Sequence, residues 1–181
     1  MWKKGLLNSD AVDVWIETYS EKVGPKVGAS VVARAWCDPD FKARLLENGT
    51  EAIKEMGIDG WFLAHVDVLE NTDKVHNLVV CTLCSCYPHG LLGLQPSWYK
   101  KEAYRSRAVR DPRSVLSEFG VELEEDVKVK VWDSTAEVRY LVLPQRPEGT
   151  EGWTEEALAG LVSRNSMIGT ERVLSVHKDR G

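Results

Sequence analysis

The amino-acid sequence predicts an α+β fold, in which a helical N-terminal arm precedes a mixed α/β domain with layered sheets. Up to residue 57, apolar residues recur at the spacing of three to four that is typical of amphipathic helices. From residue 61 the spacing changes to two, and short strand-like and helix-like segments then alternate to the C-terminus. We therefore expect an arm at residues 1–57 and an α+β domain at residues 58–181.

Short helices punctuated by Gly and Pro make up the predicted arm. A Ser9-Asp10 signal begins the first, Gly24-Pro25 and Asp38-Pro39 separate the next two, and Thr50 is expected to cap the fourth. Their apolar stripes are Val12, Ile16, Tyr19 and Val23; Val27, Val31 and Ala35; Phe41, Leu45 and Leu46; and Ile53 with Met56. Helices this short need packing partners, so we expect them to lie against other elements or another chain.

The domain is expected to contain strands on both sides of a helical segment. Alternation begins at Trp61 and passes through Phe62, and a short apolar run at residues 75–80 is typical of a buried strand. Further strands are predicted near residues 127–132 and 138–142, joined as a hairpin across Asp133-Ser134. Helices are predicted after Pro96, reaching Tyr104, and after Asp111-Pro112 and Thr154.

Composition argues against several functional classes. The chain of 181 residues has a formal net charge of −5 and no basic stripe, so we expect no nucleic-acid partner. No segment has the apolar length of a membrane span, and the run Gly5-Leu6-Leu7 is too short for a signal peptide. We expect a cytoplasmic protein, where thiols stay reduced unless chemistry uses them.

The segment Cys81-Thr82-Leu83-Cys84-Ser85-Cys86 is the strongest chemical signal. A tight turn there gathers three soft thiolate donors, and backbone nitrogens between close thiolates lie beside any metal they bind. Such a donor set favours a trivalent metal. A zinc site or an iron–sulfur cluster is the alternative, but a structural zinc needs a fourth ligand from His89, His76 or Cys37. A redox pair fits less well, because such sites lack the third cysteine.

The residues around these cysteines resemble the α subunit of nitrile hydratase. The matching motifs are VCTLCSCYP, then LGL, WYK and YRSR, then VWDS, RYLVLPQRPEGTEGWTEE and MIG, with RAW, DP and FKARLL upstream. The strongest part runs from about residue 71 to 169. Thiocyanate hydrolase carries a related subunit and is the nearest rival. A non-enzymatic zinc-binding or cobalt-carrier module is a third possibility.

The resemblance implies a metal site with defined ligands. It implies sulfur ligation by Cys81, Cys84 and Cys86, and main-chain nitrogen ligation by Ser85 and Cys86, around a low-spin Co(III) or Fe(III). It further implies that Cys84 is a sulfinate and Cys86 a sulfenate, held by arginines of a β subunit. Thr82 favours cobalt, since iron members of the family usually have Ser there.

The implied reaction is that of a lyase, the hydration of a nitrile to its amide. Cys84 and Cys86 are the expected catalytic residues, with the Cys86 sulfenate acting as nucleophile or base beside a Lewis-acidic metal. His89-Gly90 replaces the Trp-Pro usual in the family, and Phe62 replaces a polar residue, so both are candidate pocket residues. We expect a bulky or nucleoside nitrile, as in the toyocamycin type. Expected partners are a β subunit, which can occur with a third chain type, and a metallochaperone or activator.

Overall fold

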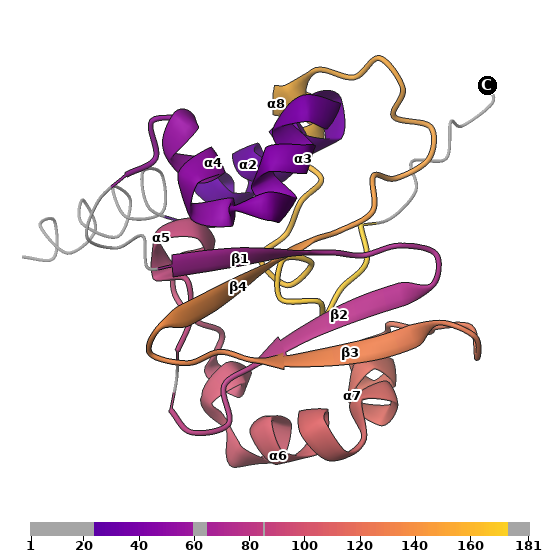
Figure 1. Cartoon of the computed structure of the whole chain (residues 1–181). Coiled ribbons are helices and arrows are strands. Elements are labelled where there is room, and N and C mark those ends of the chain that lie inside the picture. Colours follow the sequence, from indigo (N-terminus) through magenta and orange to yellow (C-terminus); the bar gives the residue numbers. More distant parts are fainter. Residues whose placement is uncertain (1–23, 60–64, 85, 174–181) are drawn as a thin grey trace, which may run out of the picture.

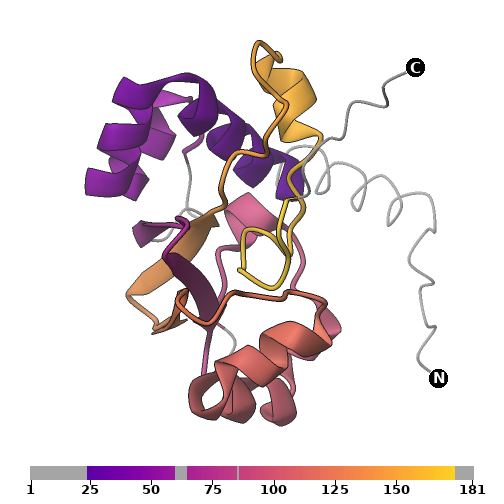
Figure 2. The same cartoon turned by 90° about the vertical axis from the view of Figure 1, so that its right-hand side faces the viewer.

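The computed structural model describes residues 24–59, 65–84 and 86–173 of the chain. Helices lie above and below a central layer of strands, as the α+β prediction requires (Figure 1). Helices α2, α3, α4 and α8 cover one side, and α6 and α7 cover the other (Figure 2). The predicted helix at residues 12–23 and the start of the predicted strand, with Phe62, lie outside the described residues.

The first helical layer comprises α2 (Pro25–Cys37), α3 (Pro39–Glu47) and α4 (Gly49–Glu55). Asp38 ends α2 and begins α3, because its carboxylate accepts hydrogen bonds from the backbone nitrogens of Asp40 and Phe41 at 3.0 and 2.9 Å. The prediction that Thr50 caps α4 is wrong: Asn48 is the cap. The Thr50 hydroxyl instead accepts the backbone N–H of Val66 at 2.8 Å and ties α4 to the first strand.

Two parallel strand pairs form the middle layer. Strand β1 (His65–Glu70) pairs with β4 (Val138–Leu143), and β2 (Val75–Val80) pairs with β3 (Lys128–Asp133). The predicted hairpin between β3 and β4 is therefore wrong, although both strands exist. Ser134 donates its backbone N–H to the Val80 carbonyl, which prolongs the β2–β3 pairing and carries the chain away from a hairpin turn.

Residues 165–170 connect the two strand pairs. The Val79 N–H donates to the Ile168 carbonyl and the Val142 N–H to the Met167 carbonyl, so this segment lies between β2 and β4. Gly169 has a φ of 93°, and a Cβ there would lie 2.0 Å from the Asn77 carbonyl oxygen, so only glycine permits this approach.

The second helical layer contains the short 3-10 helix η1 (Ser97–Lys100), α6 (Glu102–Arg110) and α7 (Pro112–Glu118). The single helix predicted after Pro96 is thus two elements, which separate at Lys101 because that residue has extended backbone angles. The remaining helices are α5 (His89–Leu92) and α8 (Glu155–Ala159), whose cap is Thr154 as predicted.

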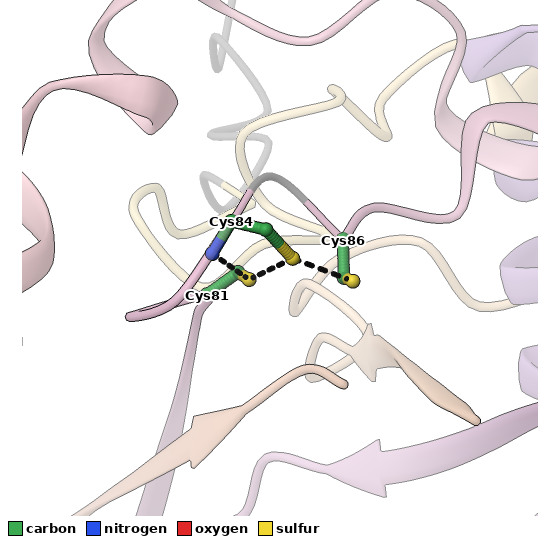
Figure 3. Close-up of side chains that lie close together, drawn as sticks. All are labelled: Cys81, Cys84 and Cys86. Carbon is green, nitrogen blue, oxygen red and sulfur yellow. Dashed lines mark hydrogen bonds between the residues drawn. The ribbon is translucent and has the colours of Figure 1, made fainter. Parts of the chain in front are cut away.

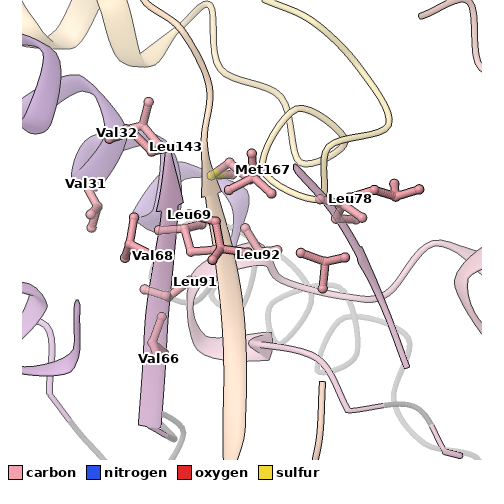
Figure 4. Packing of buried hydrophobic residues seen from close by; sticks show 14 of the residues in the cluster. Val31, Val32, Val66, Val68, Leu69, Leu78, Leu91, Leu92, Leu143 and Met167 are labelled. Carbon is pink, nitrogen blue, oxygen red and sulfur yellow. The ribbon is translucent and has the colours of Figure 1, made fainter. Parts of the chain in front are cut away.

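One apolar core joins these layers. Val31 and Val32 of α2 face β1, and Met167 lies between the strands that carry Leu143 and Leu78 (Figure 4). Residues of the predicted arm therefore share a core with the strands. The boundary at residues 57 and 58 stays a prediction. Within the described ranges, no helix is both long and apolar enough to traverse a bilayer.

Candidate metal centre

The three clustered cysteines follow directly on the buried strand β2. This strand is buried along nearly its whole length, so it holds the start of the loop rigidly. Cys81 is 0% exposed, Cys86 is half-buried, and Cys84 is exposed. We call residues 81–86 the cysteine loop. Its geometry follows from a fixed first residue and a turn that bends back over it.

The sulfurs of the cysteine loop converge on one point (Figure 3). Cys84 Sγ lies 3.2 Å from Cys81 Sγ and 3.0 Å from Cys86 Sγ, and the backbone nitrogen of Cys84 donates to Cys81 Sγ at 3.3 Å. None of the chain's cysteines forms a disulfide. The loop therefore presents three thiol donors to a single centre.

These spacings distinguish between coordination geometries. With a metal–sulfur bond of about 2.3 Å, two ligands at 90° lie about 3.3 Å apart, whereas two ligands at the tetrahedral angle lie about 3.8 Å apart. The observed 3.0 and 3.2 Å match adjacent positions of an octahedron. Within the described ranges, no histidine or fourth cysteine joins the cluster. Two of the three sulfur separations thus fit ligands at right angles better than the tetrahedral geometry of structural zinc.

Side chains from distant elements fix the backbone of the cysteine loop. Asp133, at the end of β3, accepts the backbone N–H of Thr82 at 2.9 Å and also its hydroxyl. Arg105 of α6 donates to the carbonyl oxygens of Thr82 and Cys84 at 3.3 and 3.2 Å. Tyr99 donates its hydroxyl to the Cys86 carbonyl at 3.1 Å. The loop is therefore held from three directions before any ion binds.

The surroundings favour neutral groups at this position. Burial and the neighbouring Cys84 sulfur raise the pKa of the Cys86 thiol to about 12, although Arg139 acts in the opposite direction. Burial likewise raises the pKa of Tyr99, which keeps its hydroxyl protonated as a donor. Ligation by thiolates therefore requires a cation that displaces the thiol protons.

The structure brings together three of the predicted site residues, Cys81, Cys84 and Cys86. Ser85 and Phe62 lie outside the described residues, so their predicted roles stay predictions. His89 begins α5 and is exposed, with Nδ1 3.2 Å from the Gly93 carbonyl and its ring edge-on to Tyr87. Burial lowers the pKa of His89, so its ring is neutral near pH 7.

The sequence analysis did not identify two residues that position the cysteine loop. Asp133 was assigned only to a hairpin turn and Arg105 to no role, but both bond directly to the loop. The motifs VWDS and YRSR were the available signal, without showing what these side chains contact. Cys37 and His76, considered as fourth ligands of a zinc site, lie outside the cluster. Cys37 is exposed at the end of α2, and His76 is buried with Nε2 2.7 Å from the Gly169 carbonyl.

Comparison with known proteins agrees with this geometry. The family model described as nitrile hydratase, alpha chain, matches residues 1–171. The chain belongs to the nitrile hydratase α-chain family. The family predicted from the cysteine segment is thereby confirmed, as is its assignment to an enzyme of the hydro-lyase class.

Relatives and solved structures of this family align over most of the chain. The α subunit of the low-molecular-weight cobalt-containing nitrile hydratase of Rhodococcus rhodochrous is 60% identical, over 92% of this chain and 80% of its own. The α subunit of the cobalt-containing nitrile hydratase of Pseudonocardia thermophila is 54% identical, over 96% of this chain and 86% of its own. A double mutant of the Fe-type nitrile hydratase of Comamonas testosteroni Ni1 superposes with a TM-score of 0.85 at 40% identity. The superposition covers 98% of this chain and 88% of the other.

Proposed function

We propose that this chain is the metal-binding α subunit of a nitrile hydratase, which hydrates a nitrile to its amide at a low-spin Co(III) centre. The observation that carries the proposal is the cluster of three cysteine sulfurs, in which Cys84 Sγ lies 3.2 and 3.0 Å from the other two, near the spacing of ligands at right angles. The cobalt-containing relatives at 54 and 60% identity support cobalt over iron. The Fe-type structural neighbour at 40% identity makes Fe(III) the second choice.

The proposed ligands come from the cysteine loop alone. Cys81, Cys84 and Cys86 would bind through sulfur, and Ser85 and Cys86 through main-chain nitrogen. A trivalent ion held there supplies Lewis acidity, which a nitrile carbon needs because it is a weak electrophile. Cys81, fully buried, anchors the ion, while the more exposed Cys84 and Cys86 face the side from which substrate arrives.

Oxidation of two cysteines completes the proposed chemistry. Cys84 would carry a sulfinate and Cys86 a sulfenate, whose oxygen acts as nucleophile or base toward the bound nitrile. A β subunit would cover this face, and Leu83, which is 91% exposed on the loop, supports that burial by another chain. An activator protein would load the metal in the cytoplasm, where thiols are kept reduced.

The proposed substrate is a bulky or polar nitrile, such as a nucleoside nitrile. His89 and Gly90 are smaller together than an indole followed by a proline ring, which supports a wider pocket beside the cysteine loop. Within the chain, His89 Nδ1 contacts the Gly93 carbonyl and Nε2 contacts the Gln95 amide at 3.3 Å, so a polar substrate would replace the Gln95 contact on this exposed ring. Phe62 is proposed as a second lining residue.

Metal analysis and intact mass of the complex test the proposal. The chain is co-expressed with its β subunit, and we expect about one cobalt per chain and a gain of about three oxygens across Cys84 and Cys86. Amide must form from a nitrile. Zinc as the bound ion, with unmodified thiols in an active preparation, would contradict the proposal.

Thiocyanate hydrolysis is the second candidate. The γ subunit of the Thiobacillus thioparus thiocyanate hydrolase is 42% identical over 92% of this chain, and a recombinant thiocyanate hydrolase with partially modified cobalt centres superposes with a TM-score of 0.80. The higher identity to nitrile hydratase subunits supports the first candidate. Parallel assays of amide formation and thiocyanate loss separate the two.

A further inference from the structure

Arg105 lies in an unusual position for a surface arginine. It extends from α6 to the cysteine loop, where one guanidinium nitrogen, Nη1, donates to the carbonyl oxygens of Thr82 and Cys84. The guanidinium lies along a surface groove of about 370 Å³, lined by Thr82, Glu102, Arg105, Ser106, Val109 and Arg110. The side chain is half-buried, so its charge is partly removed from water.

No carboxylate neutralises this charge. Within the described part of the chain, Arg105 forms no ion pair, whereas Arg34, Arg44 and Arg107 are each paired with a carboxylate. Its Nε is buried and has no acceptor among the described residues. A half-buried cation that donates to neutral carbonyl oxygens would gain further stabilisation if negative charge developed at one of those oxygens.

The Cys84 carbonyl is where such charge would develop. It belongs to the peptide bond to residue 85, whose nitrogen is a proposed metal ligand. When that nitrogen bonds to the ion, its N–H proton leaves to solvent and the electron pair of the N–H bond remains on the peptide. Amide resonance spreads this negative charge from nitrogen to the carbonyl oxygen.

We propose that Arg105 is a positioning residue that offsets the negative charge of the Cys84–Ser85 peptide in the metal-bound state and thereby retains the trivalent ion. This inference rests on the proposed function, since it presupposes amide-nitrogen ligation. It assigns Arg105 a role through the charge of the ligand peptide, not contact with substrate. A charge-assisted hydrogen bond is about twice as strong as a neutral one, so the contact should matter most when the ion is bound.

The alternative is that Arg105 merely holds the loop in shape. Arg113 provides the matched control, because it donates in the same way to backbone carbonyls of Leu123, Glu124 and Glu125, far from the cysteines in sequence. A purely structural contact stabilises the metal-free and metal-bound states equally. A contact to a charged peptide stabilises the metal-bound state more.

The test uses the complex co-expressed with its β subunit and loaded with cobalt. Arg105→Met removes the charge and the donors, Arg105→Lys keeps the charge at a similar length, and Arg113→Met is the control. We expect Arg105→Met to lose cobalt to excess EDTA at least about tenfold faster than wild type, the factor of one charged hydrogen bond. Arg105→Lys should lose cobalt at a rate between those of wild type and Arg105→Met. Arg113→Met should lose cobalt at the wild-type rate.

Thermal unfolding of loaded and metal-free protein provides a second readout. We expect Arg105→Met to lower the midpoint more in the loaded than in the metal-free state, and to shift the sulfur-to-cobalt absorption band. Arg113→Met should lower both midpoints equally and leave the band unchanged. Equal shifts for Arg105→Met in both states, with an unchanged band, would overturn the inference while leaving the proposed function intact.

Chemical rescue separates charge from shape if Arg105→Met folds poorly. In Arg105→Ala the groove at residue 105 is open to a small solute. Ethylguanidinium should slow cobalt loss severalfold, whereas its neutral analogue ethylurea should not. Equal effects of both solutes would contradict a role for charge. A wild-type complex that takes up no cobalt at all would overturn the proposed function and this inference together.

Discussion

The two ends of strand β2 differ in the groups that they bring together. At its start, Asn71, His76 and Asn77 form a buried polar cluster, with exposed fractions of 7, 4 and 3%. Asn77 donates to the Glu70 carbonyl and to Asn71, and accepts from the Trp132 indole at 2.9 Å. At its other end, the cysteine loop gathers three sulfurs, and residues outside the loop hydrogen-bond to its backbone and to the Thr82 hydroxyl.

The difference shows which end the chain completes on its own. The Asn77 cluster satisfies its donors and acceptors with protein groups, so we expect it to contribute to stability. The cysteine loop has a fixed backbone and three sulfurs that converge on one point, where a cation would bind. We therefore expect substitutions at the two ends to affect different properties: metal retention at one end, stability at the other.

Cys84→Ala should produce the largest effect of all. It removes the central sulfur, which lies within 3.2 Å of both others, so cobalt retention and amide formation should fall by more than about a hundredfold. Stability of the metal-free chain should change by about 0.5 kcal/mol or less, because Cys84 is exposed.

Cys37→Ala is the control for this substitution. Cys37 is also exposed but lies at the end of α2, outside the cluster. It should leave cobalt content and amide formation unchanged. Elemental analysis and an amide assay measure both variants, and cobalt bound at wild-type level by Cys84→Ala would disprove the ligand assignment.

Asn77→Ala should have the opposite profile. It removes hydrogen bonds to Glu70, Asn71 and Trp132 in a buried setting, which should cost about 3 kcal/mol of unfolding free energy. The folded fraction should still hold cobalt at wild-type level, since the cysteine loop lies at the other end of β2.

Urea denaturation of the metal-free chain measures this loss, with Asn48→Ala as the matched control. Asn48 is an exposed helix cap, so its substitution should cost only about 1 kcal/mol. Equal losses for the two asparagines would mean that the buried cluster is not a special source of stability.

The position of the cysteine loop and the bounds of the helices could be predicted from the sequence. The strand partners and the contacts that support the loop could not, for physical reasons. The position of the cysteine loop followed from the short apolar run at residues 75–80, which ends just before Cys81. Helix bounds followed from local signals such as Asp38-Pro39. These features depend on residues close together in the chain, so a single sequence reveals them.

Strand partners and loop supports could not be predicted in this way. Alternating valines identify β3 and β4 but not their neighbours, and Asp133-Ser134 resembles a hairpin turn until Asp133 bonds to Thr82, 51 residues away. Arg105 reaches the Cys84 carbonyl across 21 residues. Long-range pairing decides these contacts, and no local pattern encodes it.

The smallest expected effect is a pH dependence at the polar end of β2. Asn71 Oδ1 accepts the backbone N–H of Asn77, which turns the Asn71 amide nitrogen toward His76 Nδ1 at 3.5 Å. His76 Nε2 lies 2.7 Å from the Gly169 carbonyl, so the ring is neutral with its proton on Nε2. A second proton on Nδ1 would face a donor.

Burial, and to a lesser extent the charge of Arg172, lower the pKa of His76 in the folded state. Below its ordinary pKa of about 6.5 the unfolded chain takes up a proton that the folded chain resists, so stability should fall as the pH decreases from 7.5 to 5. The slope cannot exceed about 1.4 kcal/mol per pH unit for one group.

His76→Gln should flatten this slope, as measured by urea denaturation across the range. His89→Gln is the control, because burial also lowers the pKa of His89 but that ring is exposed; its substitution should flatten the slope less. An unchanged slope in His76→Gln would mean that the polar end of β2 tolerates the charge.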